Sequence, residues 1–588
     1  MKHQSRAWNG IKHPMTIHGR FPTLSASCLL TLVVANLVLA DPPGQAAKTG
    51  LATPTLTRIQ DFLVLAPLPD GRLMGIFDRT VDGVPETAAK YSTDDGRSWG
   101  DAATLFKLPR ELGGWGLHNT LVDSKGELHL FFTNDANTGA ETNLYKKHYD
   151  IWHVGSARGR SQWKAPNLVR QGYYGSMLSV IELRGGRLIL PVCYLTPRKW
   201  SSRGNGFDAF AFMGRFSSGI LYSDDAGQTW SQSDVEFKTP TPIIGADGMI
   251  EPIALELKDG RVWLLIRTQL GRFFESFSQN GSSWSPPRPT SILSSDSPPS
   301  LVRLKDGRIV MLWNNCLRFS YANGGRHTLH GAISDDEAKT WRGYREVARN
   351  PLVGEPPPPN GDHGVSYTTP VVTARGVVVT PVSVGGSGGN YLLHLAPDWL
   401  LETSRSADLG KGLEEWSTFG TRGVEVTDHP DRPSQKVLRL RKTDRDWPAG
   451  AVWNFPSGTR GTLRLRLRGQ PGFSGGSVGI TDHFSVPFDF EDQVYNLYDL
   501  AIGPDGRLPG GGRLDPGRWH DLQLEWDTAR SECRVQLDGR PVARLKQSRE
   551  TVGACYLRLR STADSTDAAG LMVEAVQVSV NDGRNKKI

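Results

Sequence analysis

The chain has 588 residues, with 68 Lys and Arg against 61 Asp and Glu, so its formal net charge at pH 7 is only +7. A chain of this length can bury more than one hydrophobic core. Its charge is spread thinly and no Lys/Arg run stands out, which argues against nucleic-acid binding. The 17 Trp fit both plugs between sheets and stacking against sugars.

The N-terminal segment reads as an export signal. His18 and Arg20 precede an apolar run over residues 28–40, and Val38-Leu39-Ala40 matches the small-residue cleavage pattern. The run is too short for a comfortable membrane span, and no other long apolar stretch follows. We therefore expect residues 1–40 to be a signal peptide and the mature protein to be secreted or periplasmic, without a stable membrane span.

An eight-residue signature, Ser-x-Asp-x-Gly-x-x-Trp, returns along the chain and is called the Asp box below. Two copies are intact and three are degraded; they occupy residues 92–99, 156–163, 223–230, 278–284 and 334–341. The Asp carboxylate is expected to accept backbone N–H groups, and the Trp to plug between neighbouring sheets. We interpret the Asp boxes as scaffold, without contact to a substrate.

A second repeat interlocks with the first: a Gly turn between two alternating apolar runs. Its six glycines are Gly71, Gly126, Gly186, Gly260, Gly307 and Gly376. Each Gly supplies the positive φ of a tight hairpin, and each interval has room for about four short strands. Six such units predict a six-bladed β-propeller over residues 52–400.

One face of such a propeller is formed where the first strand of each blade begins and the second strand ends, and ligands bind there. The spacing from the turn glycines places these polar residues on that face: Asp61, Asp78, His118, Glu251, Arg267 and Tyr367. Polar groups at the ends of apolar strands are typical of a functional face. We expect these side chains to converge.

After Trp399 the Asp boxes stop and new alternating strands begin. Period-two alternation with many Gly turns over residues 405–582 predicts an antiparallel jelly-roll sandwich, so the whole chain is expected to be all-β. The segment Gly517-Arg518-Trp519-His520, with the strand that follows it, resembles the laminin-G/concanavalin-like domains. That resemblance leaves two roles open, glycan binding or packing on the neighbouring domain.

The cysteines are few. Cys193 and Cys316 lie on expected inner strands and are interpreted as buried thiols. Cys533 and Cys555, both in the C-terminal region, are expected either to pair in an exported protein or to remain free. No Cys/His spacing suggests zinc, and no cofactor is expected.

The Asp boxes and the strand pair over residues 249–267 resemble the bacterial sialidase (neuraminidase) superfamily. In that family a Glu begins this strand and an Arg ends the next, sixteen residues later, as Glu251 and Arg267 do. The family's next Arg lies eight residues before a downstream Asp box, where this chain has Arg326. The nucleophilic Tyr stands in a short Ser-Tyr-x-Thr-like stretch, which Tyr367 and its neighbours match.

The resemblance implies an exo-acting glycoside hydrolase that removes terminal sialic acid or a related acidic sugar from a glycan or glycoconjugate with retention. Tyr367 would be the nucleophile and Glu251 its general base, because a neutral Tyr suits an anionic sugar but needs a base. Asp82 is the first choice as the acid for the leaving group, and Asp78 is the second.

Substrate binding would fall to arginines, because a sugar carboxylate is read by bidentate hydrogen bonds. Arg267 and Arg326 are two of these, and His118 is expected to contact the ligand as well. The family's third arginine is represented by Arg58, which is three residues out of register. Asp61 fills that register instead, so either a short insertion brings Arg58 to the site or the third arginine is missing.

Two other functions stay open. One is a glycan-binding propeller without catalysis, and the other is a hydrolase or lyase that acts on a different acidic polysaccharide with the same scaffold. Binding without turnover would favour the first, and turnover only on uronate polymers would favour the second. The sequence leaves the oligomeric state undetermined.

Overall fold

The computed structural model describes residues 52–107, 114–135, 149–157, 162–172, 174–196, 215–239, 248–316, 325–350, 364–384, 389–418, 422–487 and 494–581. Regular structure in these ranges is β-strand, apart from the short 3-10 helices η2 (Pro397–Leu401) and η3 (Leu409–Lys411). The expected all-β class is confirmed. The expected signal peptide, residues 1–40, lies outside the described residues. Within them, no helix is long and apolar enough to cross a membrane.

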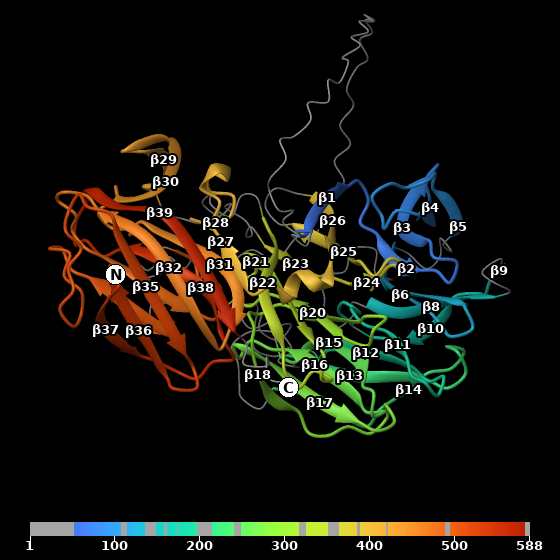
Figure 1. The fold of residues 1–588 in the computed structure, drawn as a ribbon. Helices are drawn as coiled ribbons and strands as arrows, with labels where there is room; N and C mark the ends of the chain where they lie inside the picture. Colours follow the sequence, from blue (N-terminus) through green and yellow to red (C-terminus); the bar gives the residue numbers. More distant parts are fainter. Residues whose placement is uncertain are drawn as a thin grey trace, which may run out of the picture. The chain divides into compact units, whose positions relative to one another are not determined.

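The first part of the described chain forms six small antiparallel sheets of four or five strands (Figure 1). The first sheet holds β2 (Val64–Pro67), β3 (Leu73–Val81), β4 (Val84–Ser92) and β5 (Ala103–Lys107). The second sheet holds β6 (Gly114–Val122), β7 (Leu128–Asp135), β8 (Tyr149–Ala157), β9 (Gln162–Trp163) and β10 (Asn167–Arg170). The third sheet holds β11 (Ile181–Glu182), β12 (Leu188–Thr196), β13 (Arg215–Ser223) and β14 (Ser231–Gln232).

The next two sheets repeat the same up-and-down order. The fourth holds β15 (Ile250–Glu256), β16 (Val262–Arg267), β17 (Arg272–Ser278) and β18 (Arg288–Leu293). The fifth holds β19 (Ser300–Arg303), β20 (Ile309–Trp313), β21 (Thr328–Ser334) and β22 (Arg342–Arg349). The sixth combines the earliest strand with late ones: β1 (Thr55–Ile59), β26 (Gly389–Leu395), β25 (Val378–Val384), β23 (Val365–Ser366) and β24 (Val371–Val372).

The glycine hairpins form as the sequence predicts. All six turn glycines have a positive φ, between 79° at Gly126 and 91° at Gly307. In each turn the glycine N–H donates to the carbonyl three residues earlier, as from Gly307 to Leu304 at 2.9 Å. A side chain would be strained at this φ, which explains why glycine recurs there.

The Asp boxes are self-contained turns. Oδ1 of Asp94 accepts the backbone N–H of Ser98 at 2.8 Å, and its Oδ2 accepts the Ser98 hydroxyl at 2.6 Å. Asp225 and Asp336 make the same pair of bonds four residues ahead. These carboxylates are therefore occupied by their own turns, and the interpretation of the boxes as scaffold is confirmed.

The six sheets share one cavity of about 480 Å³, lined by the innermost segment of every sheet. The lining comes from β2, β6, β15, β19 and β24 and from residues 178–181. Side chains that hydrogen-bond across neighbouring sheets close its wall, as between Ser300 and Thr368, whose hydroxyl oxygens are 2.5 Å apart. Six sheets around one cavity fit a β-propeller.

The C-terminal part consists of two further antiparallel sheets. The larger holds β27 (Ser404–Ser406), β29 (Val424–His429), β30 (Arg432–Lys442), β32 (Arg460–Gly469), β35 (His520–Asp527), β36 (Glu532–Leu537), β37 (Arg540–Lys546) and β39 (Asp567–Asn581). The smaller holds β28 (Trp416–Ser417), β31 (Gly450–Gly458), β33 (Gly476–Thr481), β34 (Tyr498–Ile502) and β38 (Ala554–Ser561).

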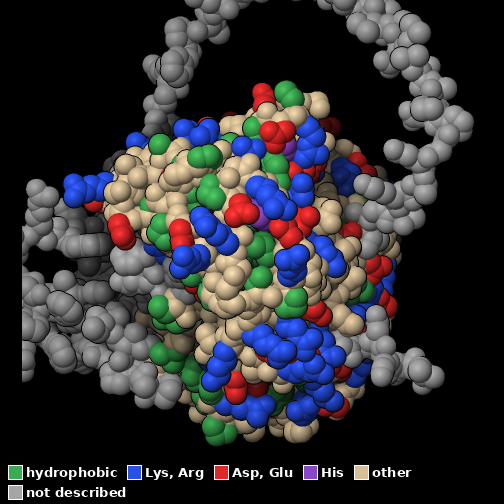
Figure 2. Space-filling model, turned by 60° about the vertical axis from the view of Figure 1, so that its left-hand side comes forward, with side chains coloured by type: hydrophobic (Ala, Val, Ile, Leu, Met, Phe, Trp, Pro, Cys, Tyr) green, Lys and Arg blue, Asp and Glu red, His purple; other side chains and the backbone are tan. Residues whose placement is uncertain are grey.

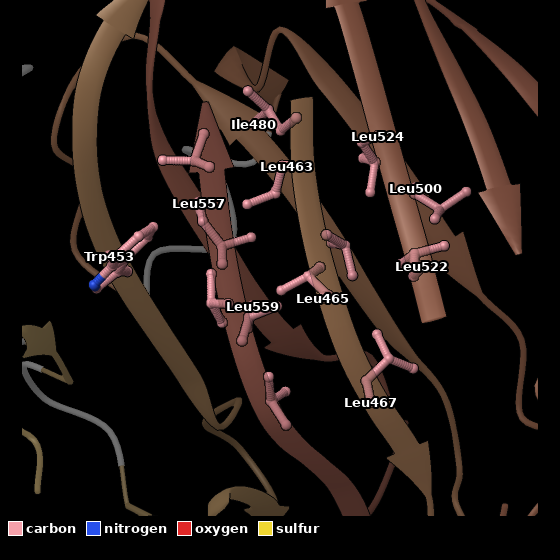
Figure 3. Packing of buried hydrophobic residues seen from close by; sticks show 14 of the residues in the cluster. Trp453, Leu463, Leu465, Leu467, Ile480, Leu500, Leu522, Leu524, Leu557 and Leu559 are labelled. Carbon is pink, nitrogen blue, oxygen red and sulfur yellow. The ribbon is translucent and has the colours of Figure 1, made fainter. Parts of the chain in front are cut away.

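These two sheets enclose one hydrophobic core (Figure 3). Leu463, Leu465 and Leu467 alternate along β32 toward side chains of the other sheet such as Trp453. The intervening arginines point outward, as period-two alternation requires. Figure 2 turns the side with the sandwich strands toward the viewer and shows Lys and Arg side chains gathered on the face in view.

The two parts of the described chain join through a mixed apolar and polar contact. One buried cluster combines Trp313 of β20 with Phe484 and Tyr556 of the sandwich. The backbones of Cys316 and Phe484 form a parallel bridge, and the Tyr556 hydroxyl donates to Glu346 at 2.6 Å. Buried polar groups that are paired in this way fix one docking geometry.

The four cysteines of the described residues are buried, free thiols. Cys193 and Cys316 are therefore buried thiols, as expected. Cys533 and Cys555 do not pair: Cys533 packs in the core of the sandwich, and Cys555 packs in the separate cluster that contains Trp313.

Candidate functional site

Three innermost strands are irregular at the positions that the sequence indicates. The pairing of β15 with β16 shifts between Ile250 and Ile253, so Glu251 lies in a β-bulge. His118 is the extra residue of a bulge in β6. Tyr367 follows the end of β23, where the inner strand breaks before β24. Bulges and breaks aim side chains away from the regular pleat, which suits a binding face.

The backbone is strained at two of these positions. Glu251 has a φ of +50° and Tyr367 has a φ of +59°, both in the left-handed region that few side chains adopt. Such conformations cost about 1–3 kcal/mol each and persist only where the surroundings impose them. The site therefore stores strain at the expected base and the expected nucleophile.

Arg267, the last residue of β16, connects these two side chains. Its Nη1 donates to Oε2 of Glu251 at 2.5 Å and to the hydroxyl oxygen of Tyr367 at 3.2 Å. Its Nε donates to Oδ1 of Asp296 at 2.8 Å. The three charged residues are at most 7% exposed. Glu251, Arg267 and Tyr367 thus converge as expected, with the guanidinium between the other two.

Asp296 is a site residue that the sequence reasoning missed. It lies in the connection after β18, where Gln269 also donates to its Oδ2 at 3.0 Å. No repeat or spacing marks this connection; the only available signal was an Asp in the Ser-rich stretch 294–297 before an inner strand. Its contacts show that it holds Arg267 in place from the side opposite to Glu251.

Arg326 completes the group. Its Nη2 donates to the backbone carbonyl of Asp296 at 3.0 Å, and its guanidinium carbon lies 5.1 Å from the centre of the Tyr367 ring. Its buried Nε has no hydrogen-bond partner among the described residues. Arg326 therefore carries an unsatisfied buried donor.

The charges of this group shape its titration. Burial raises the pKa of Tyr367, and the negative charge of Glu251 raises it further against the two nearby arginines. Burial alone would lower the pKa of Arg267, but Glu251, Tyr367 and Asp296 raise it well above its ordinary value. Two carboxylates balance two guanidinium groups, so the group carries no surplus positive charge.

A second set of expected residues joins the first two sheets. Asp78 of β3 accepts the Thr87 hydroxyl at 2.9 Å and the backbone N–H of Leu117 at 2.8 Å. Loss of hydration raises the pKa of Asp78, against these two bonds. His118, next to Leu117, contacts the Thr133 hydroxyl at 2.7 Å, and burial lowers its pKa to about 4. His118 is therefore neutral at pH 7.

The remaining expected residues lie elsewhere. Arg58 is exposed on β1, the outermost strand of the sixth sheet, where it pairs with Tyr391. The expectation that a short insertion carries it to Arg267 and Arg326 is therefore corrected, because the whole of β1 is held by its pairing with β26. Asp61 precedes β2 and accepts a bond from Lys90 at 3.2 Å. Asp82 is exposed in the two-residue turn between β3 and β4, with a φ of +48°.

The described residues bring together no group of three or more His, Cys, Asp or Glu that could hold a metal ion.

Comparisons with known proteins extend this description. No curated protein matches the chain in sequence. Among solved structures, Trypanosoma rangeli sialidase is 15% identical over 88% of this chain and 91% of its own, with a TM-score of 0.38. The same enzyme in complex with sialic acid gives 15% identity over 88% and 90%, with a TM-score of 0.39. A protein of unknown function from Dyadobacter fermentans is 16% identical over 58% and 99%, with a TM-score of 0.41. Similarities of this size carry no argument about this chain.

The match to a protein family is the firmer finding. It spans residues 71–380, which include all six turn glycines, Glu251, Arg267, Arg326 and Tyr367. The repeats, the six sheets and this match agree: the chain belongs to the BNR repeat-like domain family.

Proposed function

We propose that the chain is an exo-acting glycoside hydrolase whose reaction takes place at Tyr367. One observation carries the proposal: Nη1 of Arg267 lies within hydrogen-bond distance of both Tyr367 and Glu251. A hydroxyl nucleophile, a carboxylate base and a fixed cation then meet in one group, two of them on strained backbone.

The reaction proceeds with retention. Tyr367 gives its proton to Glu251, and its oxygen bonds to the anomeric carbon as the glycosidic bond breaks. The leaving oxygen takes a proton from an acid. Water then attacks the anomeric carbon, gives a proton to the conjugate base of that acid, and releases the Tyr367 oxygen, which regains its proton from Glu251. Because the pKa of Tyr367 is raised, a base is needed, and Glu251 is near enough for its charge to act on that pKa.

Asp78 is the better supported acid. Its raised pKa favours the protonated form that an acid needs, and its bond to Leu117 places it beside His118. Asp82, the first choice from the sequence, is the second candidate. It lies at the tip of a hairpin, which would have to bend inward to reach a bound substrate. His118 contributes as a neutral hydrogen-bonding group.

An acidic sugar remains the proposed substrate, with terminal sialic acid as one member of that class. Arg326 has a buried donor to spare and lies against the nucleophile, so it suits a carboxylate. Arg267 would have to exchange one of its two carboxylate partners to help. Arg58 lies on an outer strand and Asp61 faces Lys90, which favours a second candidate, a hydrolase or lyase of another acidic glycan on the same scaffold.

We also propose a finer architecture for the two parts of the chain and a cellular location for the protein. The six sheets would be the six blades of a propeller over residues 52–400, and residues 405–582 a laminin-G/concanavalin-like jelly roll. Residues 1–40 would direct export, so that the enzyme meets glycans outside the cell or in the periplasm.

One assay tests the function. Wild-type protein and Tyr367→Phe are incubated with fluorogenic α-sialosides, other acidic glycosides and neutral glycosides. We expect release from an acidic glycoside by the wild type only. Binding of glycans without turnover by either protein would contradict catalysis and favour a glycan-binding propeller.

A further inference from the structure

A second cavity, of about 560 Å³, lies where the fourth and fifth sheets meet the sandwich. We call it the junction cavity. The propeller part contributes residues 270–272, Ser291, Leu293, Asn315 and Tyr344, and the sandwich contributes Asp482, His483, Tyr495 and residues 549–552. Its volume falls in the range of sites for small ligands, about 300–1,000 Å³.

The polar side of the junction cavity is fixed by ion pairs and hydrogen bonds. Arg549 donates to both carboxylate oxygens of Asp482, at 2.5 and 2.8 Å, in a bidentate pair. Asp482 also accepts the Thr551 hydroxyl at 2.7 Å and contacts His483 at 2.8 Å. These contacts lower the pKa of Asp482, against the effect of burial. The wall is therefore ordered before any ligand arrives, which reduces the entropy cost of binding.

The rim of the junction cavity exposes apolar surface. Tyr495 is 45% exposed, Val552 is 43% exposed and Leu270 is 36% exposed. Arg549 also donates to the Tyr495 carbonyl at 3.0 Å, and the Tyr495 ring stands edge-on to His483. An exposed aromatic ring beside polar groups is the arrangement that a sugar ring needs, with C–H groups on the aromatic face and hydroxyls on the polar wall.

The charges that line the junction cavity point to a neutral ligand. Arg272 and Arg549 stand against Asp482 and Glu550, and Asp482 is already paired. Neither arginine of this described lining has a buried donor without a hydrogen-bond partner, whereas Arg326 has one in its Nε. A neutral pyranose therefore fits the cavity better than an acidic one.

The junction cavity shares a wall with the Tyr367 group. The turn after β16 supplies Leu270 to the cavity and, one residue earlier, Gln269 to Asp296. The last residue of β18, Leu293, lines the cavity, and the connection after it supplies Asp296 to Arg267. Each of these two short stretches of chain therefore supplies one residue to the junction cavity and another to the group around Arg267.

We propose that the junction cavity is a binding subsite for a neutral sugar unit of the substrate, with a pyranose against the ring of Tyr495. The subsite rests on the proposed function only for its role in hydrolysis; the binding of a neutral sugar stands on the cavity alone. The sandwich would then take part in substrate recognition by supplying half of this site.

Binding is tested first, with lactose, cellobiose and maltose as neutral probes in saturation-transfer NMR. Wild-type protein and Tyr367→Phe should both bind at least one probe. Tyr495→Ala should weaken that binding roughly tenfold, because a ring contact is lost. Tyr495→Phe, which keeps the ring, and Val494→Ala, an exposed neighbour outside the cavity lining, should bind as the wild type does.

Hydrolysis is tested second, with a minimal aryl glycoside and an oligosaccharide that carry the same terminal sugar. The ratio of kcat/KM for the extended to the minimal substrate should fall roughly tenfold in Tyr495→Ala and stay unchanged in Val494→Ala. Absence of binding to every probe, or binding that survives Tyr495→Ala, overturns the subsite. Probe binding that depends on Tyr495 in a protein without hydrolysis supports the sugar site and refutes the proposed function, so the two failures are distinguishable.

Discussion

Nε of Arg267 lies 2.8 Å from Oδ1 of Asp296, and both side chains are almost fully buried. Glu251 holds the same guanidinium from the other side. The position of the cation beside Tyr367 therefore depends on a second carboxylate as well as on Glu251. This relationship leads to the first prediction.

Asp296→Asn should lower kcat by roughly one to two orders of magnitude, because Arg267 loses one of two balancing charges and its fixed orientation. KM should change less, and the fold should survive, since Glu251 still neutralises the guanidinium. Steady-state kinetics with circular dichroism checks this. Asp306→Asn, at an exposed hairpin turn, is the matched control. An unchanged kcat would remove Asp296 from any positioning role.

Tyr367→Phe should reduce kcat on the order of a thousandfold or more, because it deletes the attacking oxygen while the ring stays against Arg326. The melting temperature should change little, since only one hydroxyl is lost. Rapid-quench mass spectrometry should detect a glycosyl adduct on a Tyr367 peptide in the wild type. Full activity in the variant would refute the assigned nucleophile.

Arg326→Lys should lower kcat/KM about tenfold or more for an acidic glycoside. Lysine keeps the charge but loses the planar fork that binds a carboxylate. For a neutral glycoside with the same leaving group, the effect should be much smaller. Equal losses on both substrates would show that Arg326 supports the Tyr367 ring and does not read a carboxylate.

The alkaline side of the pH–rate profile should report Asp78. Its raised pKa means that the protonated form persists above the usual range for Asp and is lost as pH rises through the folded-state value. In Asp78→Asn the rate should fall and this limb should disappear. Asp82→Asn serves as the comparison, and loss of the limb there instead would transfer the acid role to Asp82.

Stability should rise with pH between about 4 and 6.5 because of buried neutral histidines. Burial lowers the pKa of His330 to about 4, while the unfolded chain keeps the ordinary value of 6.5. Nδ1 of His330 accepts the N–H of Asn315, so its Nε2 donates to Tyr556 at the junction between the two parts. In this window the unfolded state binds more protons, so stability is lost as pH falls through it.

Urea titrations at pH 7.5, 6 and 5 check this prediction. His330→Gln should flatten part of the decline, and the rest should remain because burial also lowers the pKa of His118 and His153, to about 4 and about 3. A decline identical to that of the wild type would contradict the assignment to His330.

Most of the fold could be predicted from the repeats, because each repeat is stabilised by contacts between residues close in sequence. A glycine with positive φ and an Asp that binds its own turn need no distant partner, so Gly307 and Asp94 could be read from the chain. The end-of-strand register likewise brought Glu251, Arg267 and Tyr367 together, since strand pairing preserves spacing.

Contacts made by the loops that connect strands could not be predicted from the sequence. Asp296 reaches Arg267 from a loop without a repeat, and the Asp78–Leu117 bond joins two sheets across a gap in sequence. Arg58 looked like a site residue because its segment resembles a motif, but its strand pairs at the outer edge of the last sheet. The junction cavity forms only where the six-sheet part docks on the sandwich. The alternation of apolar and polar residues within either part does not predict how the two parts dock.

That outer strand has a consequence for how the chain folds. Thr55 of β1 pairs with His394 of β26, so the first strand of the described residues has no partner until β26 of the sixth sheet has been synthesised. Until then its backbone donors and acceptors form an open edge, which is prone to mispairing with other chains. The wait also makes the closing contact a long-range one, which slows folding. A permuted chain that begins at β2 and carries β1 after β26 would turn this pairing into a local hairpin, and so separate the cost of the delay from the stability that the β1–β26 pairing provides.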